Sequence, residues 1–385
     1  MRRVVPALAA LLLVAGCSTP TSYNPLRWIG VMDPPANQPT PLTEIKAPLV
    51  APRASWSTSV GRSGGYAFRP IIERNRVFAA SADGTLSILE ETSGKVLSRF
   101  DTKKKLSAGV EVGDNKIIVG TAKGEVLAYK TDGALAWSAQ VTGELIAPAA
   151  VSRKVVVVRT SDGRIYGFGL EDGKRRWVYQ RQSPALLLRS ESGVLAVGGD
   201  VVAGYPNGKL IALDIEDGKL TWEATVSTPR GSTDLERIAD VAGMPMIDGP
   251  RVCAVAFQGK VSCLEIQTRN VIWARDLSSS RSLVADAKNI YVVDDTSNVH
   301  ALSKETGTSV WKASTLQHRR LTSPIVFDGR VVVGDLQGYL HVLAPDNGAI
   351  IGRLATDGSA IHSIIPTLSG LVVQTEKGSV VMVRF

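Results

Sequence analysis

One unit of this sequence contains two apolar runs and a tryptophan. It reads Lys116-Ile117-Ile118-Val119-Gly120, then Lys123-Gly124-Glu125-Val126-Leu127-Ala128-Tyr129, then Asp132-Gly133, and it ends with Trp137. Short runs of β-branched and aromatic residues between glycine turns are typical of antiparallel strands. The unit therefore predicts a hairpin, a polar turn and a further strand that carries the tryptophan.

The unit recurs from Phe68 to the end of the chain. Its hairpin turn falls at eight positions, spaced by 40, 39, 45, 51, 39, 40 and 40 residues: Gly84, Gly124, Gly163, Gly208, Gly259, Asn298, Gly338 and Gly378. Such a period fits four short strands with their turns, as in a propeller blade. Glycine or asparagine is expected at the turn because primed hairpin turns need positive φ. We predict an all-β fold, a single eight-bladed β-propeller of four-stranded antiparallel blades.

The tryptophans indicate how the ring closes. Five of them occupy the last strand of a copy: Trp137, Trp177, Trp222, Trp273 and Trp311. The eighth copy stops at Phe385, before this strand, whereas Trp56 precedes the first copy. We expect the segment from Ser55 to Val60 to supply the outer strand of the last blade, which removes an open sheet edge. Copies one and seven carry Ser98 and Gly352 instead of tryptophan. We interpret the tryptophans as blade core.

The N-terminus has the pattern of an export signal. Two arginines precede an apolar run from Val4 to Ala15, which is too short to span a membrane. The following Gly16-Cys17 completes a stretch that resembles a bacterial lipobox, in which the cysteine is acylated and becomes the mature N-terminus. The alternative is an ordinary secretory signal with an incidental cysteine. Ser18 is not the aspartate that retains such lipoproteins in the inner membrane, so the resemblance implies the outer membrane.

The chain is therefore expected to have three parts. Residues 1–16 are a signal peptide, residues 17–54 hold the lipidated Cys17 and a proline-rich tether, and residues 55–385 form the propeller. Eight prolines between residues 18 and 54 predict a stiff, extended segment. The formal net charge is +8, but lysines and arginines are interleaved with acids, which indicates no nucleic-acid partner.

No pattern of catalytic or metal-binding residues is present. Four histidines lie at different points of the repeat without metal-ligand spacing, and we interpret them as structural or surface residues: His300, His318, His341 and His362. Nucleophile elbows, zinc-binding cysteine pairs and phosphate loops are also missing from the sequence. We expect no catalytic residue, no metal and no cofactor.

Cys253 and Cys263 flank the turn at Gln258 and Gly259 symmetrically. They are therefore expected to be cross-strand neighbours with side chains on one face of the sheet. In an oxidising compartment this placement permits a disulfide. It is equally consistent with two buried free thiols.

Two copies exceed forty residues, and both excesses lie between Gly163 and Gly259. Extra length in a repeat array maps to loops, which commonly carry binding. The first excess includes residues 182–189 and the second includes residues 228–241. A leucine cluster beside an arginine has the composition of an interface hot spot. The alternative for Leu186–Leu188 is a blade strand that buries alternate leucines, an interpretation we prefer for Leu187.

The blades resemble those of pyrroloquinoline-quinone enzymes, so a quinone-dependent dehydrogenase is the enzyme alternative. Those enzymes carry an adjacent cysteine pair over the cofactor. The cysteines of this chain, Cys17, Cys253 and Cys263, include no such pair.

Across nearly its whole length the chain resembles the BamB family, the propeller lipoproteins of the outer-membrane β-barrel assembly machinery. The resemblance rests on the lipobox, the tether, the blades and four stretches: residues 186–192 (LLLRSES), 231–241 (GSTDLERIADV), 321–324 (LTSP) and 333–341 (VGDLQGYLH). It implies a non-enzymatic scaffold, lipid-anchored in the outer membrane and facing the periplasm. Its implied partners are the POTRA domains of BamA, the other lipoproteins of the complex and unfolded outer-membrane protein clients. A generic periplasmic protein-binding or cell-wall-binding propeller is the alternative.

The resemblance also implies a docking site. The family's two leucines and arginine correspond to Leu186, Leu188 and Arg189, and its first loop aspartate corresponds to Asp240. The second aspartate is replaced by Ala242. We add Asp234 and Arg237 as neighbours. We further expect Arg189 and Asp240 to orient the partner, with an ion pair between them.

Overall fold

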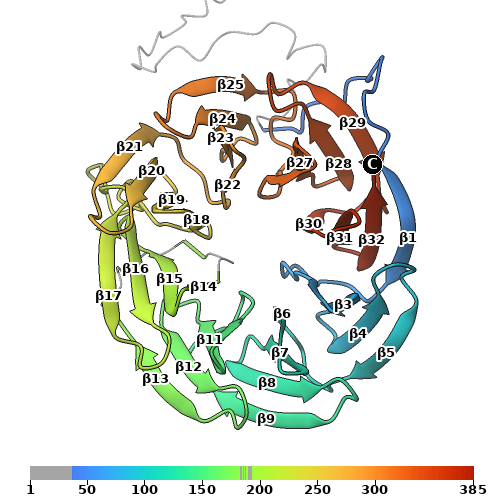
Figure 1. Ribbon diagram of the computed structural model, residues 1–385, viewed down its shortest axis with the longest axis vertical. Helices are drawn as coiled ribbons and strands as arrows, with labels where there is room; N and C mark the ends of the chain where they lie inside the picture. Colours follow the sequence, from blue (N-terminus) through green and yellow to red (C-terminus); the bar gives the residue numbers. More distant parts are fainter. Residues whose placement is uncertain (1–36, 183, 185, 187, 190–192) are drawn as a thin grey trace, which may run out of the picture. The chain divides into compact units, whose positions relative to one another are not determined.

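The computed structural model describes residues 37–182, 184, 186, 188–189 and 193–385. Contacts divide the chain into residues 1–38 and residues 39–385. Residues 39–385 form eight four-stranded antiparallel sheets arranged as blades in a ring (Figure 1), which confirms the predicted fold class. No helix among the described residues is long and apolar enough to cross a membrane.

Blades 1 to 4 follow one another along the chain, each running from its inner to its outer strand. Blade 1 contains β2 (Ile71–Glu73), β3 (Arg76–Ala80), β4 (Thr85–Glu90) and β5 (Val96–Asp101). Blade 2 contains β6 (Ala108–Gly113), β7 (Lys116–Gly120), β8 (Glu125–Lys130) and β9 (Leu135–Gln140). Blade 3 contains β10 (Ala150–Ser152), β11 (Val155–Arg159), β12 (Ile165–Gly169) and β13 (Arg175–Tyr179). Blade 4 contains β14 (Leu195–Val197), β15 (Asp200–Tyr205), β16 (Lys209–Asp214) and β17 (Leu220–Thr225).

Blades 5 to 7 repeat this order, and blade 8 combines the two ends of the ring. Blade 5 contains β18 (Met246–Asp248), β19 (Arg251–Val255), β20 (Lys260–Glu265) and β21 (Val271–Asp276). Blade 6 contains β22 (Val284–Ala285), β23 (Asn289–Val293), β24 (Val299–Ser303) and β25 (Ser309–Ala313). Blade 7 contains β26 (Ile325–Phe327), β27 (Arg330–Gly334), β28 (Tyr339–Leu343) and β29 (Ile350–Ala355). Blade 8 contains β30 (Ile361–Pro366), β31 (Leu371–Thr375), β32 (Ser379–Arg384) and β1 (Arg53–Ser59).

The core lies between blades. The second and third strands of each blade are almost wholly buried, because both of their faces pack against neighbouring blades. Ile118 of blade 2 and Val156 of blade 3, for example, belong to one apolar cluster. Continuous apolar runs such as Ile117–Val119 follow from burial on both faces.

The ring closes as predicted. Strand β1 pairs antiparallel with β32, in a register that joins Arg53 to Arg384 and Ser59 to Ser379. Trp56 lies on β1 and so completes blade 8 as its outer-strand tryptophan. The first and last strands of the propeller thereby satisfy each other's backbone hydrogen-bonding groups.

Five outer-strand tryptophans each join a blade to the next. The indole Nε1 of Trp137 donates to the Leu170 carbonyl at 2.9 Å, and Trp56, Trp177, Trp273 and Trp311 make equivalent bonds to Glu91, Ile215, Lys304 and Pro345. Each ring covers a glycine of the next blade; a Cβ at Gly173 would lie 2.5 Å from the Trp137 ring. Trp222 makes no such bond to the described residues, and blade 5 has Arg269, at φ 64°, in the place of the glycine.

Residues 39–52, which we call the strap, lie on blade 7. Leu49 and Val50 donate backbone hydrogen bonds to the Ile351 carbonyl, at 3.0 and 3.2 Å. A Cβ at Gly352 would lie 2.8 Å from the Val50 carbonyl oxygen. Blade 7 therefore lacks a tryptophan because the strap occupies its place. The sequence pattern had assigned this segment to the extended tether.

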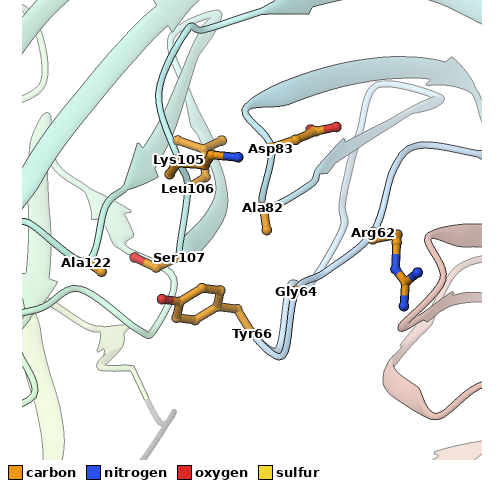
Figure 2. Close-up of a pocket in the computed structure, with 9 residues that line it drawn as sticks. All are labelled: Arg62, Gly64, Tyr66, Ala82, Asp83, Lys105, Leu106, Ser107 and Ala122. Carbon is orange, nitrogen blue, oxygen red and sulfur yellow. The ribbon is translucent and has the colours of Figure 1, made fainter.

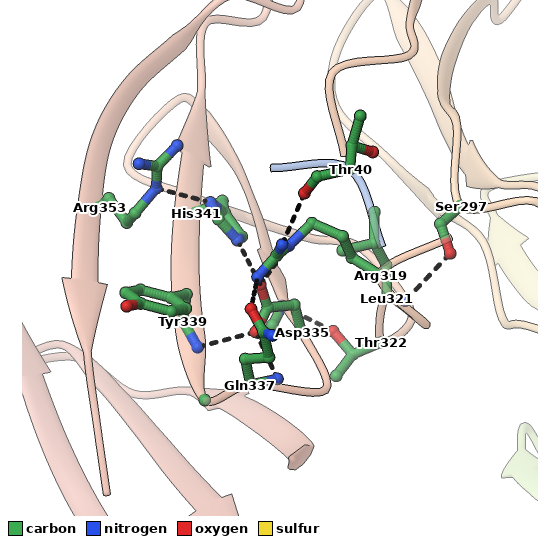
Figure 3. A network of polar contacts seen from close by, with 12 residues as sticks. Thr40, Ser297, Arg319, Leu321, Thr322, Asp335, Gln337, Tyr339, His341 and Arg353 are labelled. Carbon is green, nitrogen blue, oxygen red and sulfur yellow. Dashed lines mark hydrogen bonds and ion pairs between the residues drawn. The ribbon is translucent and has the colours of Figure 1, made fainter. Parts of the chain in front are cut away.

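A buried polar network holds the other end of the strap (Figure 3). Arg319, only 2% exposed, donates from Nη1 to the Thr40 carbonyl at 2.8 Å and from Nε to Asp335 at 2.7 Å. Arg353 donates to the Thr43 carbonyl at 2.9 Å. Burial acts to raise the pKa of Asp335, but hydrogen bonds led by that from His341 outweigh it and lower the pKa. Burial lowers the pKa of His341, whose role here is structural.

The hairpin turns correct one expectation. Six of the eight predicted turn residues have positive φ, but Gly259 and Asn298 do not; Gln258 (49°) and Ser297 (68°) take that conformation instead. Glycine is required at position 259 for another reason. A Cβ there would lie 2.6 Å from the Ser227 hydroxyl, so close packing selects the residue.

Candidate partner-binding site

Two long loops lie at one end of the propeller. Because strands alternate in direction, the hairpin between second and third strands lies at the same end as the connector to the next blade. We call this the connector end. Its two longest connectors are residues 180–194, between β13 and β14, and residues 226–245, between β17 and β18. These are the insertions that the repeat spacing predicted.

The first connector presents Leu186 and Arg189 to solvent. Leu186 is 47% exposed, Leu188 is half-buried and Arg189 is exposed. Leu186 and Leu188 lie in a loop and in no strand. Leu187 lies outside the described residues. The Arg189 guanidinium donates to Glu144, on the β9–β10 connector, at 2.8 Å.

Asp240 of the second connector points inward. Its side chain is buried, and Oδ2 accepts a hydrogen bond from the Leu188 backbone N–H at 2.8 Å. Oδ1 accepts one from the Asn207 N–H at 3.3 Å. The structure therefore does not form the expected ion pair between Arg189 and Asp240, because Arg189 pairs with Glu144. Asp240 joins the two connectors and thereby positions Leu188.

Arg159, at the end of β11, supplies a positive charge near Asp240. Its guanidinium carbon lies 5.2 Å from the centre of the Tyr205 ring, within the range of a cation–π interaction. Its Nη1 is buried and has no hydrogen-bond partner among the described residues. Burial lowers the pKa of Arg159, while Tyr205 and Asp240 act to raise it.

The second connector carries the two added residues. Asp234 is exposed, whereas Arg237 donates from Nε to the Gly231 carbonyl at 3.0 Å and so braces its own loop. Between them Leu235 is 65% exposed. Ala242, at the position of the family's second aspartate, is only 3% exposed, so this position offers no side chain to a partner.

The structure describes two of the three cysteines. Cys253 and Cys263 are directly opposed on β19 and β20, are buried, and are joined by a disulfide. That the disulfide is present in the cell stays a prediction, which a thiol assay on the native protein tests. Cys17 lies outside the described residues.

A cavity of about 460 Å3 opens at the connector end near blades 1 and 2 (Figure 2). Tyr66 and Leu106 provide apolar lining, and Lys105 and Asp83 lie nearby. A hydrogen bond from Ser81 lowers the pKa of Asp83 and occupies its carboxylate. The Ser107 hydroxyl donates to the Leu145 carbonyl. The cavity lining thus pairs no serine nucleophile with a base.

One serine–histidine pair occurs near the propeller axis, where Ser63 Oγ lies 3.0 Å from His362 Nε2. A catalytic triad would place a carboxylate on the other ring nitrogen, but Glu376 approaches the same Nε2, at 3.9 Å. Ser63 is also fully buried. Within the described parts of the chain, no group of three or more His, Cys, Asp or Glu side chains could hold a metal ion.

Three comparisons connect this architecture to known proteins. A family model described as outer membrane protein assembly factor BamB matches residues 82–313 and 297–384. Curated proteins of that name are similar over most of the chain. The relative from Bordetella pertussis is 39% identical over 98% of this chain and 95% of its own length, and that from Escherichia coli K12 is 31% identical over 98% and 97%.

Solved structures agree with the fold. The crystal structure of BamB from Moraxella catarrhalis matches with a TM-score of 0.81 at 25% identity, over 87% of this chain and all of that chain. A quinohemoprotein alcohol dehydrogenase from Comamonas testosteroni matches with a TM-score of 0.68 at 11% identity, over 86% of this chain and 76% of that chain. The second likeness shows the propeller fold alone.

Sequence reasoning missed three residues of the candidate site: Glu144, Arg159 and Leu235. Glu144 lies on a connector of ordinary length and Arg159 at the end of a strand, each 45 residues or more from its partner. No local pattern distinguishes them. Leu235 lay inside a loop already identified, and its exposure was the missing information.

Proposed function

The chain belongs to the BamB family of outer membrane protein assembly factors, and from this premise we propose that it is a non-enzymatic scaffold of the β-barrel assembly complex. It binds the POTRA domains of BamA through its connector end. With the other lipoproteins of the complex, it helps to deliver and insert unfolded outer-membrane proteins.

One observation carries the proposal: Asp240 joins the two connectors at Leu188, next to the exposed Leu186 and Arg189. Leucines exposed or half-exposed on a fixed backbone lose little conformational entropy on binding. Full burial of one such side chain contributes about 1.5–3 kcal/mol. The exposed Arg189–Glu144 ion pair is weak, so the arginine can exchange Glu144 for a partner carboxylate.

The anchor belongs to the same proposal. Residues 1–16 are removed on export, and acylated Cys17 holds the protein on the periplasmic face of the outer membrane. Several acyl chains on one residue make such an anchor hard to reverse, because each buried methylene contributes roughly 0.8 kcal/mol. Mass spectrometry of the purified N-terminal peptide tests the modification.

Enzymatic activity is the less supported alternative. The dehydrogenase likeness concerns the fold, and the sequence lacks the adjacent cysteine pair of those enzymes. Fold alone does not imply function.

The test is a pull-down of detergent-solubilised complexes from a Gram-negative host. The parent protein is expected to recover BamA, and a variant with Leu186→Ala and Arg189→Ala is expected to lose it. A matched control carries Leu220→Ala and Arg176→Ala; Leu220 is as exposed as Leu186, and Arg176 forms an exposed ion pair with Glu216 at 2.9 Å. Recovery of no BamA by the parent protein would contradict the proposal and favour a generic periplasmic binding propeller.

A further inference from the structure

The tip of the second connector is a short turn that caps itself. Glu236 Oε2 accepts hydrogen bonds from the backbone N–H groups of Ser232 at 2.8 Å and Thr233 at 3.1 Å. In return, Thr233 Oγ1 accepts one from the Glu236 N–H at 3.3 Å. This reciprocal pair is a capping box, which satisfies the backbone donors of the turn within the turn itself. The hydrogen bonds from Thr233 and Ser232 lower the pKa of Glu236 and keep it ionised.

Two further braces fix the turn. Arg237 donates from its side chain to the Gly231 carbonyl at 3.0 Å and from its backbone to the Thr233 carbonyl at 3.1 Å. With its amide nitrogen facing the loop, Gln258 of blade 5 donates to the carbonyls of Leu235 and Ile238, at 3.1 and 3.2 Å. The backbone of Leu235 is therefore held from its own loop and from the neighbouring blade.

Leu235 nevertheless points into solvent, with 65% of its surface exposed. The described contacts that hold the turn use backbone and polar groups. None of them involves the Leu235 side chain. An apolar side chain on a preorganised backbone binds a complementary pocket at low entropic cost. Exposed Asp234 beside it adds a negative charge at the rim.

We propose that Leu235 is a third apolar contact for the partner of the connector end, besides Leu186 and Leu188. The partner is a folded domain with an apolar socket for this leucine and a basic group at the socket's rim for Asp234. The proposal rests on the proposed function and extends the interface from the first connector to the tip of the second.

Asp240 is the physical link between these contacts. It belongs to the second connector, and its carboxylate holds the first connector at Leu188. A domain that buries Leu188 thus meets two loops with a fixed relative position. Binding at both loops then gains affinity without a new ordering cost.

The experiment compares Leu235→Ser with Leu368→Ser in the full-length, anchored protein. Leu368 is an exposed leucine too, on the turn between β30 and β31 at the opposite end of the propeller. Titration with purified BamA is expected to show binding weakened about tenfold by Leu235→Ser and unchanged by Leu368→Ser. A second variant, Glu236→Ala, keeps the leucine but releases the turn, and is expected to weaken binding several-fold. All variants should unfold at the parent's temperature.

Parent-like affinity of Leu235→Ser, or equal weakening by Leu368→Ser, would overturn this inference while leaving the proposed function intact. If the parent protein itself recovers no assembly partner, both the function and the inference are overturned.

Discussion

The Asp240 carboxylate accepts a hydrogen bond from the Leu188 backbone N–H at 2.8 Å, across 52 residues of sequence. This bond makes the two longest connectors of the propeller into one structure. A residue that the family resemblance places in the interface is thus a buried support for its neighbours.

Replacing Asp240 with alanine is expected to loosen the first connector and abolish partner binding. The Leu188 and Asn207 N–H groups lose their acceptor, which costs about 1–3 kcal/mol. Asp240→Asn should be intermediate, because an amide oxygen can accept from only one of them while its NH2 group opposes the other. Hydrogen exchange of residues 188–194 provides the measurement. Asp234→Ala is the control, and faster exchange in that variant would contradict the assignment.

Arg269→Gly is expected to stabilise the protein by about 0.5–1 kcal/mol. A non-glycine residue in the left-handed region is strained, and its Cβ stands where other blades receive a tryptophan ring. The gain exceeds the entropy that glycine adds to the unfolded chain. Thermal unfolding measures the effect. Arg269→Ala keeps the Cβ and should show no gain; an equal rise in both variants would exclude this explanation.

Arg319→Met is expected to destabilise the protein by about 3–5 kcal/mol and to release the strap. Asp335, which is fully buried, would lose a charged partner, and the Thr40 carbonyl would lose its donor. Limited proteolysis should then cut within residues 39–52. Arg353→Met removes a strap contact without removing a partner of Asp335, so its stability loss should be smaller. Equal losses would show that the strap contact alone carries the effect.

Glu111→Gln is expected to stabilise the protein above neutral pH. Burial raises the pKa of Glu111 to about 7, although the charge of Arg69 opposes the shift. Folding therefore favours the protonated carboxyl, and its stabilisation is complete below pH 4.5 and is lost as the pH rises to about 7. Urea unfolding at pH 4.5, 6 and 8 should show the variant gaining about 1–3 kcal/mol over the parent across this range. A difference that does not change with pH would refute the assignment.

The repeat, the blade number and the ring closure could all be predicted from sequence. The turn residues between strands recur about every forty residues in five of the seven intervals, and Trp56 lies where a missing outer strand is needed. These features are local or periodic, so their structural meaning does not depend on distant contacts. The placement of the long loops followed from the same spacing.

The details of the candidate site could not be predicted in this way. Loops have no hydrophobic period, so the local sequence does not indicate that the Asp240 side chain is buried or that the Leu235 side chain is exposed. Arg189 selects Glu144 only because two connectors 45 residues apart meet at one end of the ring. The strap likewise reads as a proline-rich tether until the buried Arg319 network holds it on blade 7.

The sequence by itself determined the eight-bladed ring, since hydrophobic periodicity and turn glycines act within one blade at a time. The tertiary structure alone decided which loop side chains support the connector end and which remain free to meet a partner. That choice depends on hydrogen bonds and charges between segments that become neighbours only after the blades have closed.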